Sequence, residues 1–254
     1  MIHATAIIHP KAKIGSDCEI GPYCVIGEHV VLGDKCKLHS HVVIDGHTTL
    51  GKDNEIFPFA SIGLKTQDLK WKGGMTRTQI GDGNTFREYV TIHSATGDGE
   101  VTTVGSHNHI LAYCHVAHNC VLGNHIIMSN AATLGGHVIV EDYAVISIAA
   151  VHQFCRVGKM SLIGGCSKIV QDVPPFMIVD GNPGETRTIN KVGMERNGVS
   201  EEAQTALRQA YKMLFREGLT ISNALAKIES ELPSLPEVKH LVQFVRASER
   251  GISK

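Results

Sequence analysis

The sequence has 254 residues, of which 43% are hydrophobic, and a formal net charge of −1 at pH 7. A chain of this length buries a sizeable core by itself, which excludes a small scaffold that depends on disulfide bonds. A net charge near zero lacks the basic excess that is typical of nucleic-acid binding, so we expect no nucleic-acid partner.

The start of the chain, MIHATAIIHPKAKIG, has no basic flank followed by a long apolar run. No other stretch approaches the roughly 18 uninterrupted apolar residues of a membrane-spanning helix. We therefore expect a soluble, cytoplasmic protein with no transmembrane segment.

Aliphatic residues recur at every sixth position from Ile2 to Ile62, and the same step resumes over 80–92, 104–146 and 151–169. A period of six fits neither an amphipathic helix nor an alternating strand. It is typical of hexapeptide repeats, in which three short strands make one triangular coil and the aliphatic side chain points inward. We predict a mostly β fold, a parallel β-helix over residues 1–180.

Most of the cysteines fall at one position of this repeat, the small inward position four residues after the aliphatic. The six at this position are Cys18, Cys24, Cys36, Cys114, Cys120 and Cys155. Buried free cysteines behave as small apolar side chains, and the sequence has no CxxC pair. We predict free thiols rather than disulfides or zinc ligands, as in a reducing compartment.

Two polar insertions interrupt the repeat, near residues 64–79 and 94–103. The first, LKTQDLKWKGGMTRTQ, contains the only tryptophan, and the second reads SATGDGEVTT. Loops that project from a rigid scaffold commonly hold binding groups, so we expect the insertions to contribute to a site.

Above the insertions, His118 and Gly136 each lie two residues after an inward aliphatic and should stack in one column. The step from Ile146 to Val151 is five residues instead of six, which brings Gln153 into the same column. A histidine, a glycine N–H and a glutamine in line suggest a base, an oxyanion donor and a polar anchor.

The alternative is that these histidines are solvated surface residues, which we expect for most of the fifteen in the chain. A cluster on successive coils favours a functional role. Its members are His93, His115, His118, His137 and His152.

Near Asp172 the repeat meets DVPPF, and because proline donates no ladder hydrogen bond, we expect the solenoid to stop there. After the linker DGNPGE the pattern becomes helical, which predicts a C-terminal α-helical domain over 190–254. Ser200 is a good N-cap for a helix that ends before Gly218. Further helices are expected over about 221–231 and 237–248.

The segments QDLK, TIH, HVAHNCVLGN, GGHV, AVHQFC and GGCSKIVQDVPPF resemble the acyl-carrier-protein-dependent UDP-N-acetylglucosamine O-acyltransferases that begin lipid A biosynthesis. The resemblance covers essentially the whole chain. It implies left-handed coils, a homotrimer with sites between subunits, and transfer of a 3-hydroxyacyl chain to the 3-position of UDP-N-acetylglucosamine. The donor would be phosphopantetheine-linked acyl carrier protein, so neither a separate cofactor nor a metal is expected. A related N-acyltransferase has an additional N-terminal domain, whereas this chain starts directly on the repeat.

The resemblance also implies roles for individual residues. His118 matches the general base, Gly136 the oxyanion donor and His115 a second histidine near the substrate. Residues that would hold the substrate are Gln67, Asp68, Lys70, His93, His137, His152, Gln153 and Arg196. Gly165, with Lys168 beside it, would limit the length of the acyl chain.

The chain departs from the family pattern in three places. Asn119 stands where an aspartate usually follows the base, and an amide orients an imidazole without supplying charge. Asn197 replaces a second arginine, and the five-residue step before Val151 alters one coil. The effect of these departures on activity stays open at the level of the sequence.

Other functions also remain open from the residues alone. An acetyl-CoA-dependent sugar acetyltransferase and a non-enzymatic scaffold share the repeat, and so does a γ-class carbonic anhydrase-like protein with zinc between subunits. The spacing of His115 and His118 and the QDLK loop argue against the zinc protein. The length of the acyl chain, and whether the acceptor carries a 3-hydroxyl or a 3-amino group, are undetermined.

Overall fold

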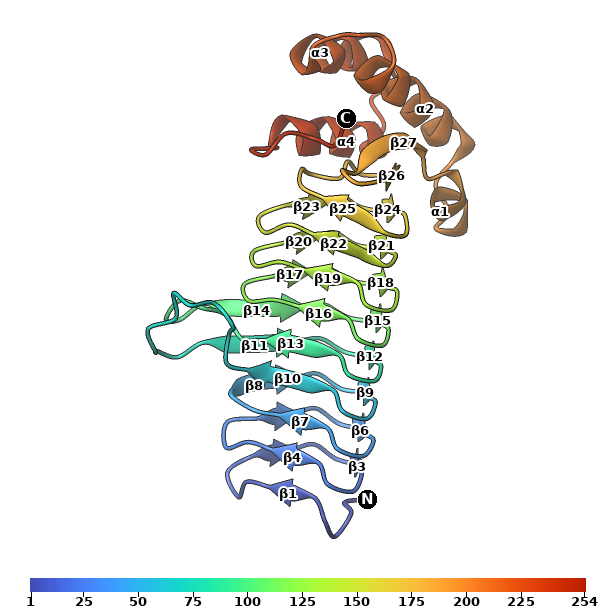
Figure 1. The fold of residues 1–254 in the computed structure, drawn as a ribbon. Helices are drawn as coiled ribbons and strands as arrows, with labels where there is room; N and C mark the ends of the chain where they lie inside the picture. Colours follow the sequence, from blue (N-terminus) through green and yellow to red (C-terminus); the bar gives the residue numbers. More distant parts are fainter.

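The computed structural model describes residues 1–254 as a column of short strands with helices at its C-terminal end (Figure 1). Every third strand pairs in parallel with the next strand of its own side, so three sheets form the sides of a triangular prism. The fold is a left-handed parallel β-helix followed by a helical segment, as predicted.

The three sheets are numbered by the order in which the chain meets them. The first sheet contains β1 (Ile7–Ile8), β4 (Val25–Ile26), β7 (Val43–Ile44), β10 (Ser61–Leu64), β13 (Thr91–His93), β16 (His115–Val116), β19 (Thr133–Leu134), β22 (Ala149–Val151) and β25 (Ser167–Ile169). The second contains β2 (Lys13–Ile14), β5 (Val31–Leu32), β8 (His47–Leu50), β11 (Arg77–Ile80), β14 (Val101–Val104), β17 (Val121–Leu122), β20 (Ile139–Val140) and β23 (Arg156–Val157). The third contains β3 (Glu19–Ile20), β6 (Lys37–Leu38), β9 (Glu55–Ile56), β12 (Thr85–Phe86), β15 (His109–Ile110), β18 (Ile127–Met128), β21 (Val145–Ile146), β24 (Leu162–Ile163), β26 (Met177–Asp180) and the antiparallel β27 (Glu185–Ile189).

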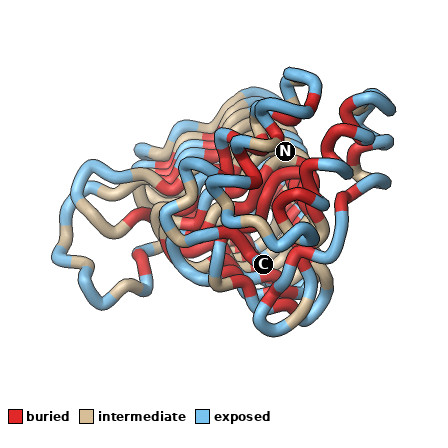
Figure 2. The backbone as a smooth tube through the Cα atoms, turned by 90° about the horizontal axis from the view of Figure 1, so that it is seen from above, coloured by how far each residue is buried: buried red, intermediate tan, exposed pale blue.

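The interior of the prism is filled by the repeat aliphatics and by the predicted cysteines. Seen from above, the buried residues gather inside the coil and the exposed ones on its rim (Figure 2). The six predicted thiols are buried and unpaired, which confirms the prediction, and Cys166 alone is exposed. Burial raises the pKa of the Cys120 thiol to about 12, so this thiol stays protonated and unreactive.

Two boundaries differ from the expectation. The insertions are shorter, because β11 and β14 pair in register from Arg77 with Val101 to Ile80 with Val104, so only 65–76 and 94–100 leave the coil. The prolines of DVPPF do not end the solenoid at Asp172, as was expected from them: Val173 still bridges to Val157, and β26 continues the third sheet to Asp180, the last residue of the range predicted for the β-helix. The prolines of DVPPF lie between these pairings, where no ladder bond is needed.

Four helices follow: α1 (Lys191–Arg196), α2 (Glu201–Phe215), α3 (Ile221–Glu231) and α4 (Pro236–Arg246). The hydroxyl of Ser200 accepts the N–H of Ala203, which confirms the predicted cap, whereas α1 was not expected. α4 returns to the top of the coil, where His240 and Glu141 form a 2.7 Å hydrogen bond. None of the helices has both the length and the apolar character needed to span a membrane.

Candidate active site

Both insertions and His118 lie at the same corner of the prism, where the chain passes from the first sheet to the second. The insertions follow β10 and β13, and His118 follows β16, so the three lie on successive coils. Figure 1 shows the loops projecting on one side between β8 and β14. Parallel pairing of the strands therefore brings segments far apart in sequence to one place.

The two insertions are tied together as one unit. The hydroxyls of Thr66 and Thr96 are 3.0 Å apart, and the Asp98 carboxylate accepts the N–H of Met75 at 2.7 Å. The Thr66 hydroxyl also accepts the N–H of Asp68 at 3.1 Å. These contacts fix the QDLK turn against the second loop.

His118 lies between two polar groups. Its Nδ1 is 2.9 Å from Oδ1 of Asn119, and its Nε2 is 3.7 Å from Oδ2 of Asp68. The second distance is too long for a hydrogen bond, so Nε2 is not engaged by the protein. The side chain of His118 is only 14% exposed. The structure thus brings the predicted base and the predicted QDLK carboxylate together.

Gly136 lies directly above this imidazole. A Cβ placed on Gly136 would be 2.4 Å from Cε1 and 2.5 Å from Nε2 of His118, so the ring needs a glycine there. Gly136 is buried, and its N–H has no acceptor in the protein. Because buried N–H groups are nearly always paired, a free one beside a candidate base suits an oxyanion.

His93 and His115 lie on the inner side of the site. Nδ1 of His115 is 2.7 Å from the Thr91 hydroxyl, and the two imidazole rings are 5.0 Å apart in an edge-on arrangement. Burial, with a smaller contribution from His93 and His118, lowers the pKa of His115 to about 4. Burial also lowers the pKa of His93. Both rings are therefore neutral hydrogen-bonding groups rather than bases at neutral pH.

The next coil supplies the upper part of the site. The His137 ring meets the His118 ring edge-on at 5.2 Å and stacks on Phe154, and burial lowers its pKa. The pairing of Leu134 with Val151 places Gln153 above Gly136, as the five-residue step predicts. The shortened turn leaves this column intact.

The remaining predicted contact groups are at the solvent edge. Gln67, Lys70, His152 and Gln153 are all exposed. The backbone N–H of Lys70 donates to Oδ1 of Asp68 at 2.9 Å, which closes the turn of QDLK. Nδ1 of His152 is 3.1 Å from the backbone oxygen of Gln153, whereas the side chains of Gln67, Lys70 and Gln153 make no hydrogen bond within the protein.

Three predicted residues are not gathered at this corner. Arg196 is exposed at the end of α1, on the side of the molecule away from the insertions (Figure 1). Gly165 follows β24 at the corner between the third and first sheets, and a Cβ there would meet nothing within 4 Å. Lys168 lies on the outer column of the first sheet that runs from His115 through Thr133 and Ala150.

Sequence reasoning missed Glu100. Oε2 of this residue, in the second insertion, accepts the N–H of Gly97 and the side-chain Nδ2 of Asn119, each at 2.7 Å. The sequence places Glu100 inside a predicted binding loop but carries no sign of its partner. The contact appears only when the coils stack.

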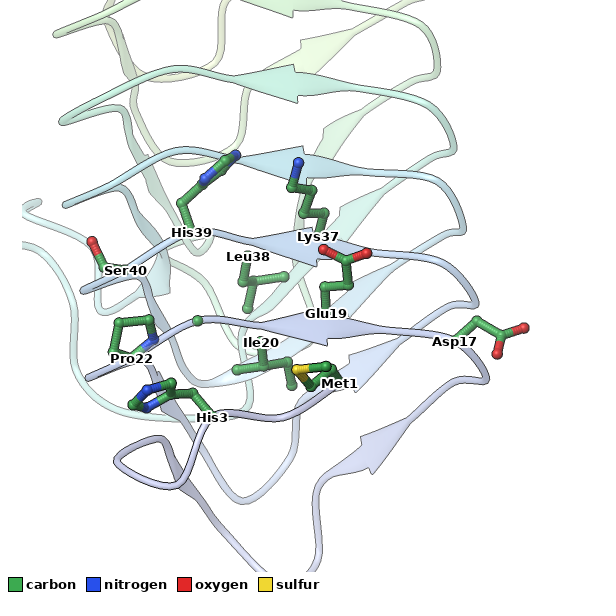
Figure 3. Close-up of a pocket in the computed structure, with 11 residues that line it drawn as sticks. Met1, His3, Asp17, Glu19, Ile20, Pro22, Lys37, Leu38, His39 and Ser40 are labelled. Carbon is green, nitrogen blue, oxygen red and sulfur yellow. The ribbon is translucent and has the colours of Figure 1, made fainter.

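An open hollow lies elsewhere, at the N-terminal end of the chain (Figure 3). It has a volume of about 620 Å³ and is lined by residues that include His3, Glu19, Lys37 and His39. No predicted site residue lines it. The candidate active site is identified by its polar groups rather than by the size of a cavity, and no three His, Cys, Asp or Glu side chains of the chain are placed to hold a metal.

The six-residue repeats, together with a histidine and a free glycine N–H at one corner, define a hexapeptide-repeat transferase. A family model described as bacterial transferase hexapeptide (six repeats) matches residues 1–34 and 11–46. A second, described as UDP N-acetylglucosamine O-acyltransferase, domain 2, matches residues 172–253.

Known relatives narrow the class further. A Thermodesulfovibrio yellowstonii protein named acyl-[acyl-carrier-protein]–UDP-N-acetylglucosamine O-acyltransferase is 49% identical over 256 residues, covering 100% of this chain and 99% of its own. The crystal structure of LpxA from Bacteroides fragilis 9343 matches with a TM-score of 0.98 at 41% identity, covering 100% of both chains. LpxA from Acinetobacter baumannii matches with a TM-score of 0.96 at 45% identity, covering 100% of this chain and 99% of that one. The chain belongs to the acyl-[acyl-carrier-protein]–UDP-N-acetylglucosamine O-acyltransferase family. These similarities do not favour the acetyltransferase and carbonic anhydrase alternatives.

Proposed function

We propose that this protein transfers a 3-hydroxyacyl chain from acyl carrier protein to the 3-hydroxyl of UDP-N-acetylglucosamine, the first step of lipid A biosynthesis. The observation that carries the proposal is the juxtaposition of an unengaged Nε2 on His118 with the unpaired, buried N–H of Gly136. Family membership supplies the substrates, and the geometry supplies the groups that the reaction needs.

In this mechanism, Nε2 of His118 removes the proton from the sugar hydroxyl as its oxygen attacks the thioester carbon. The C–S bond then breaks, an oxygen ester forms, and the proton passes to the leaving thiolate. Neutral imidazole has suitable basicity near pH 7, and the Gly136 N–H donates to the oxygen that becomes negative. His115, with its pKa of about 4, acts as a hydrogen-bonding group.

The proposed substrate contacts are made by residues at the same corner of the prism as His118. Oδ2 of Asp68 lies 3.7 Å from Nε2 of His118, close enough to accept a hydrogen bond from a sugar hydroxyl next to the one that gives its proton to Nε2. We assign contacts with the nucleotide sugar to Gln67, Lys70, His93, His137, His152 and Gln153 as well. Of these, His137 has its ring 5.2 Å from the ring of His118. The donor brings its own phosphopantetheine arm, and the reaction uses neither a further cofactor nor a metal.

The position of Arg196 supports a homotrimer. Because α1 lies away from the insertions of its own chain, the arginine reaches a phosphate in the site only from a neighbouring copy (Figure 1). A threefold assembly places one copy against the corner of the next. Light scattering that gave a monomer at micromolar concentration would contradict the trimer.

The acyl chain would lie over the first sheet. Gly165 is about two and two-thirds coils above His118, a rise of roughly 13 Å at about 4.8 Å per coil. It is also at the opposite edge of that sheet, so the path crosses the face as well as rising. Gly165 and Lys168 would limit the chain at its far end. Buried free thiols fit a cytoplasmic location.

Replacement of His118 by alanine tests the proposal. We expect turnover of UDP-N-acetylglucosamine with 3-hydroxyacyl carrier protein to fall by about 10²- to 10⁴-fold, the usual contribution of a general base. His109→Ala, on the third-sheet strand β15 just before β16, removes an exposed imidazole as a matched control and should leave turnover unchanged. The products are identified by mass spectrometry, with acetyl-CoA as an alternative donor. Turnover within about threefold of wild type in folded His118→Ala would contradict the assignment.

A further inference from the structure

The second insertion carries a carboxylate that reaches His118 through one intervening amide. His118 Nδ1 is 2.9 Å from Asn119 Oδ1, and Asn119 Nδ2 donates to Glu100 Oε2 at 2.7 Å. We infer that Glu100 is a positioning residue for the reaction proposed above: it orients the Asn119 amide and supplies the negative charge that position 119 lacks. The inference deepens the proposed function and depends on it.

The contacts of Asn119 allow only one orientation of its amide. Oδ1 accepts the backbone N–H of Thr96 at 3.0 Å, and a backbone N–H only donates. Nδ2 faces Glu100, and a carboxylate only accepts. An inverted amide would place two donors together at one end and two acceptors together at the other.

That orientation selects the tautomer of the base. Because Oδ1 of Asn119 accepts, Nδ1 of His118 carries the proton and Nε2 keeps its lone pair toward Asp68 and the substrate. Without Glu100 the amide could rotate and present its NH₂ group to Nδ1. Nε2 would then be protonated and unable to act as a base.

Glu100 is itself held in place and charged. Its Oε2 accepts the N–H of Gly97 at 2.7 Å in addition to the Asn119 amide. The Asn119 hydrogen bond, followed by that of Gly97, lowers the pKa of the Glu100 carboxyl below its usual range. The carboxylate is exposed, so solvent screens its effect on the imidazole.

Other ionisable groups face His118 from every neighbouring element. Asp68 comes from the first insertion and approaches Nε2, whereas Glu100 acts from the Nδ1 side, away from the reacting atoms. His93 and His115 lie on the first sheet, His137 on the next coil, and Lys70 near His137. Only Glu100 connects to Nδ1 by hydrogen bonds.

Glu100→Gln separates charge from geometry, because the glutamine oxygen still accepts both hydrogen bonds. We expect kcat to fall about 3- to 10-fold with KM unchanged, and the acid limb of the pH–rate profile to move about half a unit lower, since loss of a nearby negative charge disfavours the imidazolium. High salt should reduce the difference. Glu100→Ala, which also releases the amide, should lose about 10- to 30-fold.

Asp98→Asn is the matched control. It removes the same charge from the same loop and keeps an oxygen that accepts the Met75 N–H, but Asp98 has no contact with Asn119. We expect its pH profile to follow the wild type. A second comparison uses two variants. Asn119→Asp places two carboxylates next to each other, at positions 119 and 100. Asn119→Asp/Glu100→Gln replaces one of them with an amide, which donates a hydrogen bond to the other. The double variant should be the more active of the two.

A measurement without substrate separates this inference from the proposed function. NMR titration of the ring protons of His118, assigned with His118→Ala, should show a lower midpoint in Glu100→Gln than in wild type or Asp98→Asn. Equal midpoints and equal acid limbs would overturn the role of Glu100. Absence of acyl transfer in the wild type would instead overturn the proposed function. The titration would still show whether Glu100 affects the protonation of His118.

Discussion

Around His118, the close approach of neighbouring coils limits which side chain fits at each position. Gly135 and Gly136 are adjacent, yet an added Cβ would have different consequences at each. At Gly136 it would collide with the imidazole of His118, and at Gly135 it would lie 2.8 Å from the backbone nitrogen of Gln153. The first contact affects a movable side chain, whereas the second affects the coil itself.

We therefore predict that an alanine at position 136 mainly impairs catalysis, whereas an alanine at position 135 mainly impairs stability. Gly136→Ala should displace the His118 ring and lower kcat by at least about tenfold, because misplacement of a catalytic group by about 1 Å is costly. Its unfolding temperature should stay close to that of wild type. Gly135→Ala should mainly lower the unfolding temperature. If both variants lost stability and activity in the same proportion, the distinction between ring and backbone contacts would be wrong.

The half-buried imidazole of His115 predicts that stability depends on pH. Its pKa is about 4 in the folded protein, below the ordinary value of 6.5. The unfolded chain therefore takes up a proton as pH falls through about 6.5, while the folded protein does so only near pH 4. The contribution of the neutral His115 ring to the free energy of unfolding is fully present above about pH 6.5 and is lost as the pH falls toward 4.

His115→Gln should reduce this loss. We expect a smaller decrease in the urea midpoint between pH 7 and pH 5 than in wild type, with His93 and His137 retaining their own contributions. Between pH 7.5 and 8.5 the difference between variant and wild type should be constant, because the ring is neutral in both states. An unchanged slope between pH 7 and 5 would show that His115 does not titrate abnormally.

At the level of elements, the two insertions act as one support for the QDLK turn. Thr66 is buried, and its hydroxyl both contacts the Thr96 hydroxyl and accepts the Asp68 N–H. Thr76 and Ser94 form a further hydroxyl bridge between the loops at 3.2 Å, which involves no atom of QDLK. Of the two hydroxyl bridges, the one at Thr66 also positions Asp68 and the one at Thr76 does not.

Thr66→Val should raise KM for the nucleotide sugar about 3- to 10-fold, with a smaller effect on kcat, since each lost hydrogen bond contributes roughly 0.5–1.5 kcal/mol. Thr76→Val removes a comparable hydroxyl and should change KM by less than about twofold. Steady-state kinetics with acyl donor at saturation measures both. Equal changes in the two variants would indicate general loosening of the loops rather than a specific role for Thr66.

In the whole molecule, Glu141 connects the helical segment to the solenoid. Its Oε2 accepts the N–H of Lys159 and the Nε2–H of His240, each at 2.7 Å, and Arg156 lies over the Phe244 ring at 4.1 Å. These contacts join α4 to two coils. They lie beside the second hydrophobic cluster, which is built from the helices and the last turns of the coil.

We expect Glu141→Gln to lower the free energy of unfolding by about 1–2 kcal/mol, because a charge-assisted hydrogen bond becomes a neutral one. Limited proteolysis should also cut α4 more readily. Glu195→Gln, which breaks an exposed pair with Lys191 within α1, should change stability by less than about 0.5 kcal/mol. A Glu141→Gln variant as stable and protease-resistant as wild type would show that apolar packing alone holds the helices.

The period of six determined the coil, the buried thiols and the column of His118, Gly136 and Gln153 without reference to any other part of the chain. This was possible because each repeat specifies one strand and one corner, and parallel stacking adds a constant number of residues. Even the five-residue step could be counted, since a shorter turn moves the register by one residue. The Ser200 cap of α2 was readable for the same local reason.

Only the tertiary structure decided what the insertions contact and which predicted residues meet. Residues 65–76 and 94–100 have no periodicity, so their side chains are placed by contacts between loops on different coils. The approach of Asp68 to His118 and the link from Glu100 to Asn119 arise there. Arg196 is separated from both because α1 leaves the coil at another side (Figure 1). Stacking determined by a repeat is encoded locally, whereas a contact between two irregular loops exists only once the coils beneath them have formed.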